Sequence, residues 1–315
     1  MTTTGKDIPS LLSKDEVVVL VTDSGLGGFS IFSQIAARAK HDPIFSRLSL
    51  IYYNAWPGPN RGYNSLKDMD TRVRVFDRAL EGMLRFTPHM ILIACNTLSV
   101  LYERTRFRRR KPIPVVDIVG FGVDMVYERL LQNTDARALL LGTATTIESD
   151  RHRSRLIEKG IPANRIAVQA CDQLATRIEK GPESDAVVEL VDACMDRAAG
   201  KLGSLKTDVL AALFCTHFGY SRELIRKSLQ CCLPGKVTVL DPNQRMVDSL
   251  FEATGGRRHP KTVVEMAVVS KIAWEKEKLD AVSNRVAPGS PEAADALRRY
   301  QWIPDLFDID DMFNE

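Results

Sequence analysis

Two cysteines occupy similar places in the sequence, each directly after a short apolar run. Cys95 follows the run 90–94 and Cys215 follows the run 209–214, and a helical pattern comes after each cysteine. In an open parallel sheet, ligands bind beyond the carboxyl ends of the strands, where the N-termini of the next helices also point. Because a helix N-terminus lowers the pKa of a thiol, we expect both thiols to be partly ionised near neutral pH.

Polar residues follow both cysteines. Asn96, Thr97 and Thr216, together with their backbone N–H groups, are suited to holding a carboxylate. His217 lies two residues after Cys215, where its imidazole can exchange a proton with that thiol. The two segments are therefore predicted to bind an acid next to two reactive thiols.

Two thiols at one site suit the inversion of a carbon atom next to a carboxylate. This reaction needs a base on one face of the carbon and an acid on the other, and the two roles exchange in the reverse direction. The residues leave one alternative open, which is acyl transfer by a single cysteine with His217 as its partner. That alternative gives the second cysteine no role.

A glycine-rich segment, LVTDSGLGGFSIF, occupies residues 20–32. Its glycines do not have the G-x-G-x-x-G spacing of a dinucleotide-binding loop. We interpret it as an anion-binding turn in which Ser24 and backbone N–H groups face the substrate. Asp23 is then an acid beside the reaction centre.

Short runs rich in β-branched residues alternate with amphipathic stretches along the chain. The predicted strands are Val17–Val21, Leu48–Tyr53, Met90–Ala94, Val115–Val119, Ala138–Leu141, Ile166–Ala170, Val209–Phe214 and Val237–Leu240. The predicted helices include Phe29–Ala39, Thr71–Leu84, Val123–Leu131, Asp150–Lys159 and Asp185–Ala199. Continuous apolar strands separated by helices of this length are typical of an α/β protein with doubly wound parallel sheets.

The spacing of the motifs favours two similar lobes. Cys95 and Cys215 are 120 residues apart, about the size of one doubly wound lobe. We predict a first α/β lobe from 1–117 with 236–280, a second from 118–235, and a C-terminal extension, 281–315. The extension has apolar residues that we expect to be buried against a lobe or a second subunit. They are Trp302, Ile303, Leu306, Phe307, Ile309 and Phe313.

Composition and charge exclude several classes of protein. The chain has 315 residues, of which 44% are hydrophobic and 26% charged, so general disorder is excluded. A net charge of +3 does not indicate a nucleic-acid partner, and the basic run 104–111 is interpreted as the solvated end of a helix. No apolar run approaches the length of a membrane span, and no signal peptide is recognisable, so we expect a cytoplasmic protein.

The other four cysteines are predicted to be packing residues. They are Cys171, Cys194, Cys231 and Cys232. The absence of any CxxC pair argues against a zinc site, so no metal is expected. A disulfide framework is not expected in a chain of this size without a secretion signal.

Four motifs together resemble a known family. The order DSGLGG, ACNT, GTATTIESD and CTHFGY resembles the glutamate racemase branch of the aspartate/glutamate racemase family, and the match runs from about Val17 to Met246. The resemblance implies two pseudo-symmetric lobes with the active site between them, and 1,1-proton transfer without a cofactor. It further implies an amino-acid substrate, with glutamate as the default, a homodimer, and a role in supplying peptidoglycan precursors.

The resemblance also assigns roles to individual residues. Cys95 and Cys215 match the two catalytic cysteines, Asp23 an auxiliary acid, and His217 the histidine beside the second thiol. The segment 171–181 resembles the family's Cys-Pro…Glu-Gly stretch, so Glu179 matches a further acid. The positions that match substrate-holding residues are Ser24, Asn96, Thr97 and Thr216.

One loop departs from the family pattern. In the stretch 52–68, Asn60, Arg61 and Gly62 stand where the family has Pro-Tyr-Gly, and no acid remains at the preceding Asp-Thr position. Because that loop contacts the distal end of the substrate in the family, Asn60, Arg61 and Gly62 are also predicted to bind the substrate, and other substrates stay open. The alternatives are a racemase or isomerase of an aspartate-, hydantoin- or maleate-type acid, and a catalytically inactive relative that binds an amino acid.

Overall fold

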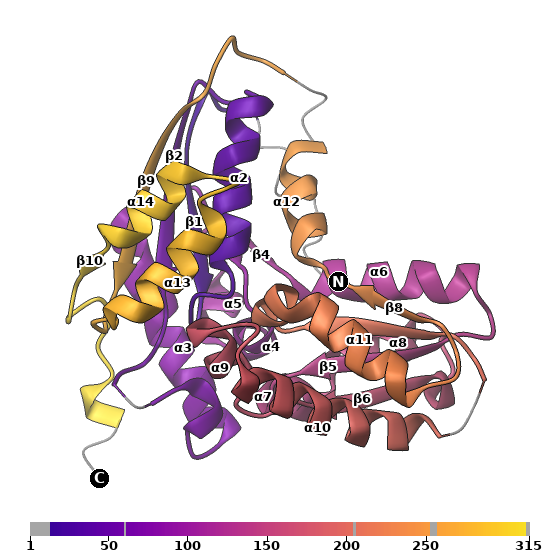
Figure 1. The fold of residues 1–315 in the computed structure, drawn as a ribbon. Helices are drawn as coiled ribbons and strands as arrows, with labels where there is room; N and C mark the ends of the chain where they lie inside the picture. The colour runs from indigo at the N-terminus through magenta and orange to yellow at the C-terminus, as the bar shows by residue number, and fades with distance from the viewer. Residues whose placement is uncertain (1–12, 60, 204–205, 253–256, 313–315) are drawn as a thin grey trace. The chain divides into compact units, whose positions relative to one another are not determined.

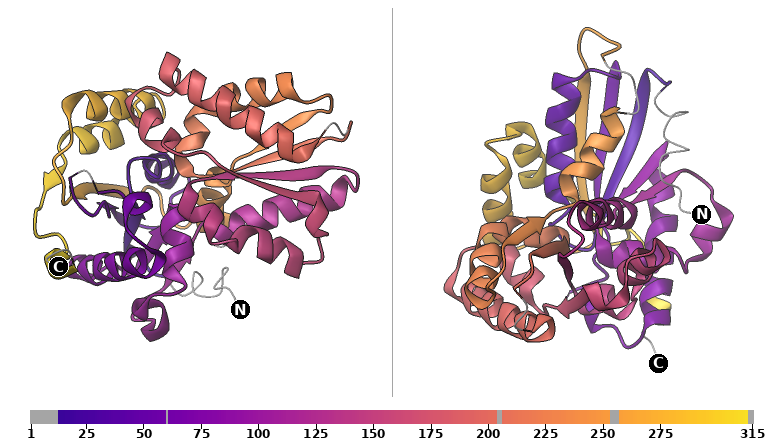
Figure 2. Two further views of the ribbon diagram at one scale, coloured as in Figure 1. Left: turned by 90° about the horizontal axis from the view of Figure 1, so that it is seen from below. Right: turned by 90° about the vertical axis from the view of Figure 1, so that its right-hand side faces the viewer.

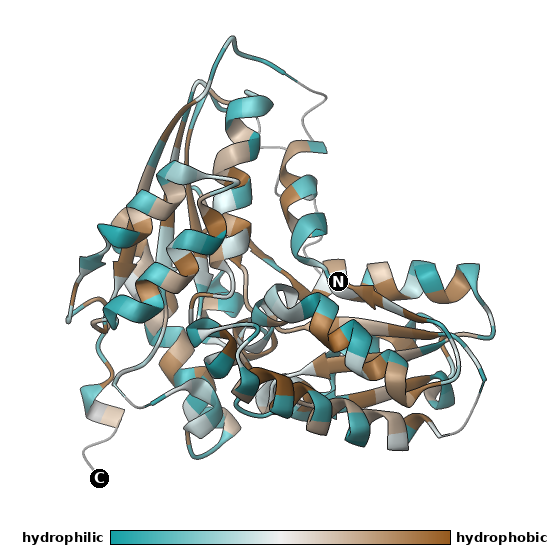
Figure 3. Cartoon of the chain, in the orientation of Figure 1, coloured by the Kyte–Doolittle hydropathy of each residue, from teal (hydrophilic) through white to brown (hydrophobic). Residues whose placement is uncertain are grey.

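The computed structural model describes residues 13–59, 61–203, 206–252 and 257–312 (Figure 1). The chain forms two compact units, one made of Met1–Ile118 with Asn243–Glu315 and the other of Val119–Pro242. Each unit is a parallel sheet with its own helices, and apolar residues are concentrated on the strands of both sheets (Figure 3).

The first unit contains a six-stranded sheet with the order β10-β9-β2-β1-β3-β4. Its strands are β1 (Glu16–Asp23), β2 (Arg47–Asn54), β3 (Met90–Ile93), β4 (Val115–Asp117), β9 (Val263–Ser270) and β10 (Gln301–Trp302). All pairs are parallel, and β1 lies between β2 and β3. In this register Asp23, the last residue of β1, pairs with Asn54, the last residue of β2.

The helices of the first unit form two groups. One group consists of α2 (Phe29–His41), α12 (Asn243–Glu252), α13 (Lys276–Val286) and α14 (Pro291–Arg298), in which α2 and α14 contact β9. The other consists of α3 (Met69–Met83), α4 (Asn96–Tyr102) and α5 (Arg106–Arg110), in which α3 contacts both of the others. Short 3₁₀ turns lie at Tyr63–Ser65, Leu84–Phe86 and Asp310–Met312.

The second unit contains a four-stranded sheet with the order β6-β5-β7-β8. Its strands are β5 (Arg137–Gly142), β6 (Ile166–Ala170), β7 (Val209–Phe214) and β8 (Val237–Leu240). The helices are α6 (Val119–Gln132), α7 (Ala144–Glu148), α8 (Arg151–Glu158), α9 (Leu174–Lys180), α10 (Asp185–Leu202) and α11 (Arg222–Cys232), with 3₁₀ turns at Ala163–Arg165 (η3) and Thr216–Ser221 (η4). Figure 2 shows helices on both faces of this sheet.

All eight predicted strands are present, but the predicted boundary between the lobes is wrong. Residues 236–242 belong to the second unit, because β8 pairs with β7 from Val209↔Val237 to Ala212↔Leu240. The sequence prediction also missed β9, which pairs with β2 along its whole length. Only the last three residues of β9 are buried, so the strand does not have the continuous apolar pattern of its neighbours.

The predicted C-terminal extension is an integral part of the first unit. The expected boundary at residue 281 falls inside α13. Leu306, Phe307 and Ile309 are buried in the core formed with β1, β3 and α3, which confirms that they pack against a lobe. The predicted burial is wrong for Trp302, which lies on the edge strand β10 and is 60% exposed. Phe313 lies outside the described residues.

Two predictions about the remaining cysteines are also corrected. Cys171 and Cys194 form a disulfide that joins the segment after β6 to α10. Cys231 and Cys232 are exposed at the end of α11 and are not packing residues.

Within the described ranges, no helix combines the length and the apolar character that crossing a membrane requires.

Candidate active site

Cys95 lies in the turn between β3 and α4, as the strand pattern predicts. Its backbone is extended, with φ −150° and ψ 120°, and it forms the N-cap of α4. The side chain is buried, and its Sγ atom lies 3.4 Å from Oγ of Ser24. Asn96 and Thr97 are the first two residues of α4 and are also buried. The first unit therefore places Ser24, Asn96 and Thr97 around one thiol.

Asp23 holds the glycine-rich loop that follows β1. Its Oδ1 atom accepts a hydrogen bond from the backbone N–H of Gly25 at 3.1 Å, and its Oδ2 atom accepts one from Gly28 at 2.5 Å. Ser24 Oγ lies 3.4 Å from Oδ1, so Asp23, Ser24 and Cys95 form one continuous row of polar atoms. A Cβ atom at Gly28 would lie 2.6 Å from the carbonyl oxygen of Ala94, which explains the glycine at that position.

The environment of Cys95 reverses one sequence-based expectation. We expected the helix N-terminus to lower the pKa of this thiol. Burial, together with the nearby carboxylate of Asp23, instead raises the pKa of Cys95 well above its ordinary value, although Ser24 acts in the opposite direction. Cys95 is consequently a protonated thiol near neutral pH, which makes it a proton donor in the resting protein.

Cys215 has the same local backbone as Cys95. It follows β7 with φ −150° and ψ 125°, and it is the N-cap of η4, which begins with the buried Thr216. Its side chain is buried and it forms no disulfide. The α-helix expected directly after Cys215 is replaced by this 3₁₀ turn, and α11 begins only at Arg222.

A histidine and a glutamate support Cys215 within the second unit. Nδ1 of His217 lies 3.7 Å from Sγ of Cys215, and Nε2 lies 2.7 Å from Oε1 of Glu179 on α9. Burial by itself would lower the pKa of His217, but the hydrogen bonds with Cys215 and Glu179 outweigh burial and raise the pKa well above 6.5. The imidazole of His217 is therefore positioned to exchange a proton with the Cys215 sulfur.

The loop that departs from the family pattern is organised around Trp56. The indole Nε1–H donates to the carbonyl oxygen of Gly58 at 2.8 Å, and Gly58 and Arg61 form an antiparallel bridge. A Cβ atom at Gly62 would lie 2.6 Å from the Trp56 ring, so the ring occupies the space beside Gly62. The side chain of Arg61 is exposed, and Asn60 lies outside the described residues.

Two residues that the sequence analysis did not select also hold the glycine-rich loop. Tyr52 Oη and Asn54 Nδ2 both donate to the carbonyl oxygen of Gly25, at 2.7 and 2.9 Å. Asn54 Oδ1 accepts from the backbone N–H of Trp56 at 3.2 Å and so joins this loop to the next one. The sequence feature that could have identified Asn54 is its position at the end of a buried strand adjacent to β1.

The predicted site residues therefore form two groups, one in each unit. The first unit brings together Asp23, Ser24, Cys95, Asn96 and Thr97, and the second brings together Glu179, Cys215, Thr216 and His217. Among the residues that the structure describes, no three His, Cys, Asp or Glu side chains are arranged to hold a metal ion.

Comparisons with known proteins give a consistent result. The model of the family described as Asp/Glu/Hydantoin racemase matches residues 24–250. A glutamate racemase of Campylobacter jejuni is 26% identical over 233 residues, which cover 74% of this chain and 84% of that protein. A glutamate racemase of Helicobacter pylori is 31% identical over 201 residues, which cover 63% and 71%. The structure of glutamate racemase from Francisella tularensis in complex with D-glutamate has a TM-score of 0.65 at 19% identity and covers 86% of this chain and 94% of that one.

Proposed function

The chain belongs to the Asp/Glu/Hydantoin racemase family, and on that basis we propose that it interconverts L- and D-glutamate by proton transfer between two thiols. It is an amino-acid racemase, and therefore an isomerase. The observation that carries the two-thiol proposal is the repeated geometry of Cys95 and Cys215. Both are free buried thiols with nearly the same backbone angles, at the ends of parallel strands.

The environments of the two thiols fit opposite roles in one direction of the reaction. We propose that a single substrate faces both cysteines. The Cys215 thiolate, next to the protonated His217, removes the α-proton. The Cys95 thiol, kept protonated by burial and Asp23, delivers its proton to the opposite face of the carbon. Afterwards Cys215 is the thiol and Cys95 the thiolate, which is the form that catalyses the reverse reaction.

The polar groups beside each thiol allow the protons to be redistributed between turnovers. His217 can exchange a proton with Cys215, while Glu179 holds the imidazole in place. Ser24 and Asp23 form the corresponding row beside Cys95. Asn96, Thr97 and Thr216 are proposed to hold the substrate through polar side chains and backbone N–H groups near the two thiols.

Glutamate is proposed because the matched relatives are glutamate racemases. We propose that the reaction needs no cofactor, and that holding the α-carbon between the two thiols favours both proton transfers. We further propose that the protein acts in the cytoplasm, because the matched relatives are glutamate racemases. There its product would supply peptidoglycan precursors, and we propose that the protein is a homodimer.

The test is a racemisation assay without any added cofactor. The purified chain, Cys95→Ser and Cys215→Ser are each incubated with L-glutamate, and the D-enantiomer is quantified by chiral chromatography. Aspartate, a hydantoin and maleate are assayed in parallel. We expect turnover of glutamate by the wild type and a loss of about a hundredfold or more in kcat/KM in each variant, because a serine hydroxyl is far less acidic than a thiol. Retention within tenfold in either variant contradicts the two-thiol proposal, and turnover of another acid alone corrects the substrate.

A further inference from the structure

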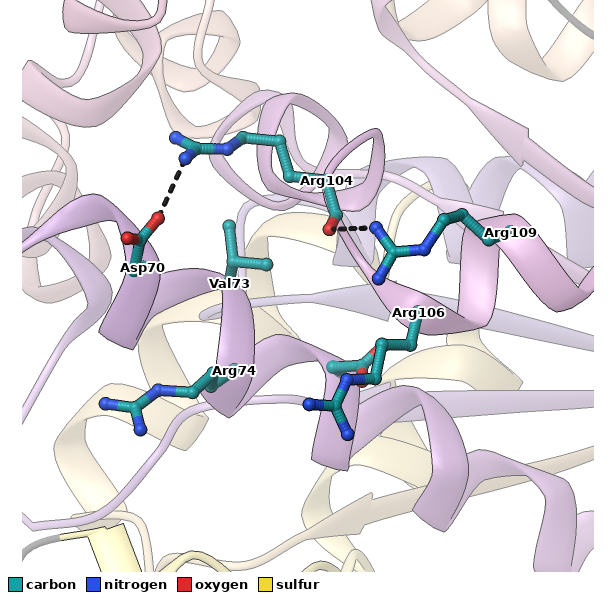
Figure 4. Close-up of a pocket in the computed structure, with 7 residues that line it drawn as sticks. Asp70, Val73, Arg74, Arg104, Arg106 and Arg109 are labelled. Atoms are coloured by element: carbon teal, nitrogen blue, oxygen red, sulfur yellow. Dashed lines mark hydrogen bonds and ion pairs between the residues drawn. The ribbon is translucent and has the colours of Figure 1, made fainter.

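A cavity of about 440 Å³ lies in the first unit between α3 and the segment 104–109 (Figure 4). Four arginines line it, with Arg74 coming from α3 and Arg104, Arg106 and Arg109 from the segment after α4. Cys95 precedes the first residue of α4, whereas these three arginines follow its last residue, and a helix of that length extends about 10 Å. The cavity is therefore separate from the proposed catalytic residues.

The lining of this cavity carries a net positive charge, with four arginines against the two carboxylates of Asp70 and Asp77. Arg104 donates to Oδ1 of Asp70 at 2.8 Å, and Figure 4 shows this pair at the cavity wall. Among the described residues, no carboxylate lies within ion-pair distance of Arg74, Arg106 or Arg109. The remaining lining carboxylate, Asp77, accepts the backbone N–H of Phe107 at 2.9 Å.

The arginines that line the cavity differ from their neighbours in the same basic run. Arg110 forms an ion pair with Glu81, and Arg108 lies 3.8 Å from a carboxylate oxygen of Glu103. Neither of these arginines lines the cavity. Arg108 and Arg110 therefore bind the protein's own carboxylates outside the cavity, Arg106 and Arg109 line the cavity, and Arg104 both lines it and binds Asp70.

The backbone that carries these side chains is firmly anchored. Phe107 is fully buried, and its N–H is bound by Asp77 on α3. Thr105 is buried and its Oγ1 atom accepts the backbone N–H of Arg108 at 3.1 Å, which caps α5. Because Arg106 lies between these two anchored residues, its backbone position is fixed relative to Arg74 on α3.

We propose that this cavity binds a small phosphorylated ligand through its phosphoryl groups. Guanidinium groups form paired hydrogen bonds with phosphoryl oxygens, and three cations without carboxylate partners match a group that carries two or more negative charges. The volume is within the range of small-molecule sites, about 300–1,000 Å³. A single carboxylate would satisfy only one of the three cations. This inference does not depend on the proposed racemisation.

The experiment is a calorimetric titration of the full chain with inorganic pyrophosphate, at low and at physiological salt. The test variant is Arg74→Gln with Arg106→Gln. The control, Arg110→Gln with Lys111→Gln, removes the same total charge at two exposed positions but keeps all four arginines that line the cavity. We expect pyrophosphate to bind the wild type more tightly than inorganic phosphate does, the test variant to lose at least tenfold in affinity, and the control to lose less than the test variant.

Several results would overturn this assignment. One is the absence of pyrophosphate binding to the wild type at millimolar concentration, and another is equal affinity in the wild type and the test variant. A single-stranded DNA oligonucleotide is titrated in parallel. If it binds more tightly than pyrophosphate and loses affinity in the same variant, the cavity belongs to a nucleic-acid surface instead. Melting curves of each variant confirm that the exposed substitutions leave the fold intact.

Discussion

Oε1 of Glu179 lies 2.7 Å from Nε2 of His217, whose other ring nitrogen faces the sulfur of Cys215. All three side chains are buried, so the carboxylate both orients the imidazole and stabilises its protonated form. Cys95 has a different arrangement, in which a hydroxyl stands between the sulfur and the carboxylate of Asp23. The two thiols are thus similar in backbone position and different in their polar partners.

Glu179→Gln should lower the pKa of His217, because Glu179 is one of the two partners that raise it. A raised pKa in the folded state stabilises the protein below the unfolded-state pKa of about 6.5, and this stabilisation is lost as the pH rises through the folded-state value. The difference in unfolding free energy between wild type and Glu179→Gln should therefore be largest at about pH 5–6.5 and shrink at higher pH.

Denaturant unfolding at a series of pH values and an NMR titration of the imidazole measure these effects. Glu183→Gln is the matched control, since Glu183 is exposed four residues later. We also expect about a tenfold loss in kcat with little change in KM. An unchanged His217 pKa in Glu179→Gln would remove Glu179 from this role.

The disulfide between Cys171 and Cys194 should contribute measurably to stability. It closes a loop with a sequence separation of 23 residues, for which chain entropy gives about 3 kcal/mol. Cys194→Ala should lower the unfolding free energy by roughly that amount without reductant, while Cys231→Ala, at an exposed free thiol, should not. Addition of dithiothreitol should abolish the difference. Six titratable thiols in the unreduced, denatured wild type, instead of four, would show that the disulfide does not form.

The C-terminal segment should be necessary for the stability of the first unit. Leu306 is 1% exposed in the core that also contains Tyr53 and Met83. Leu306→Ala should therefore lower the free energy of unfolding by about 2–5 kcal/mol. Trp302 is 60% exposed and donates one hydrogen bond to the carbonyl of Lys271, so Trp302→Ala should cost about 1 kcal/mol or less. Chemical denaturation measures both values. Equal losses of unfolding free energy in the two variants would mean that Leu306 is not buried in the core of the first unit.

Arg61 should contribute little to substrate binding, because its side chain is exposed. A charge-assisted hydrogen bond to a substrate carboxylate is worth about 1.5–3 kcal/mol, so loss of such a bond would reduce kcat/KM about tenfold or more. We expect Arg61→Ala to lower kcat/KM by less than about threefold for both glutamate and aspartate. A loss of tenfold on either substrate would place Arg61 at the substrate and change the interpretation of this loop.

The features predicted correctly from sequence are those set by local pattern. The apolar runs before Cys95 and Cys215 gave both strand ends, and periodicity gave α2, α3, α6, α8 and α10. Features set by tertiary pairing were not predicted. The membership of β8 in the second sheet depends on its partner strand, and the Cys171–Cys194 pair depends on how α10 packs.

The electrostatics of the site also depend on tertiary structure. A helix N-terminus alone predicts a lowered pKa for Cys95, whereas the folded protein surrounds this thiol with apolar neighbours and the Asp23 carboxylate, which raise its pKa. The role of Asn54 was missed for the same reason, because it follows from strand register rather than from a motif.

Separate thiols are proposed to act on the two faces of one α-carbon, and racemisation of L-glutamate in heavy water distinguishes this mechanism from proton exchange at a single thiol. The reaction is stopped at about a tenth of conversion, and the deuterium at the α-carbon of each enantiomer is measured by mass spectrometry after chiral separation. Because one thiol removes protium and the other delivers a solvent-exchanged proton, D-glutamate should carry deuterium while the remaining L-glutamate carries protium. D-glutamate that keeps the original protium, or deuterium that enters recovered L-glutamate as fast as product forms, would rule out the two-thiol mechanism.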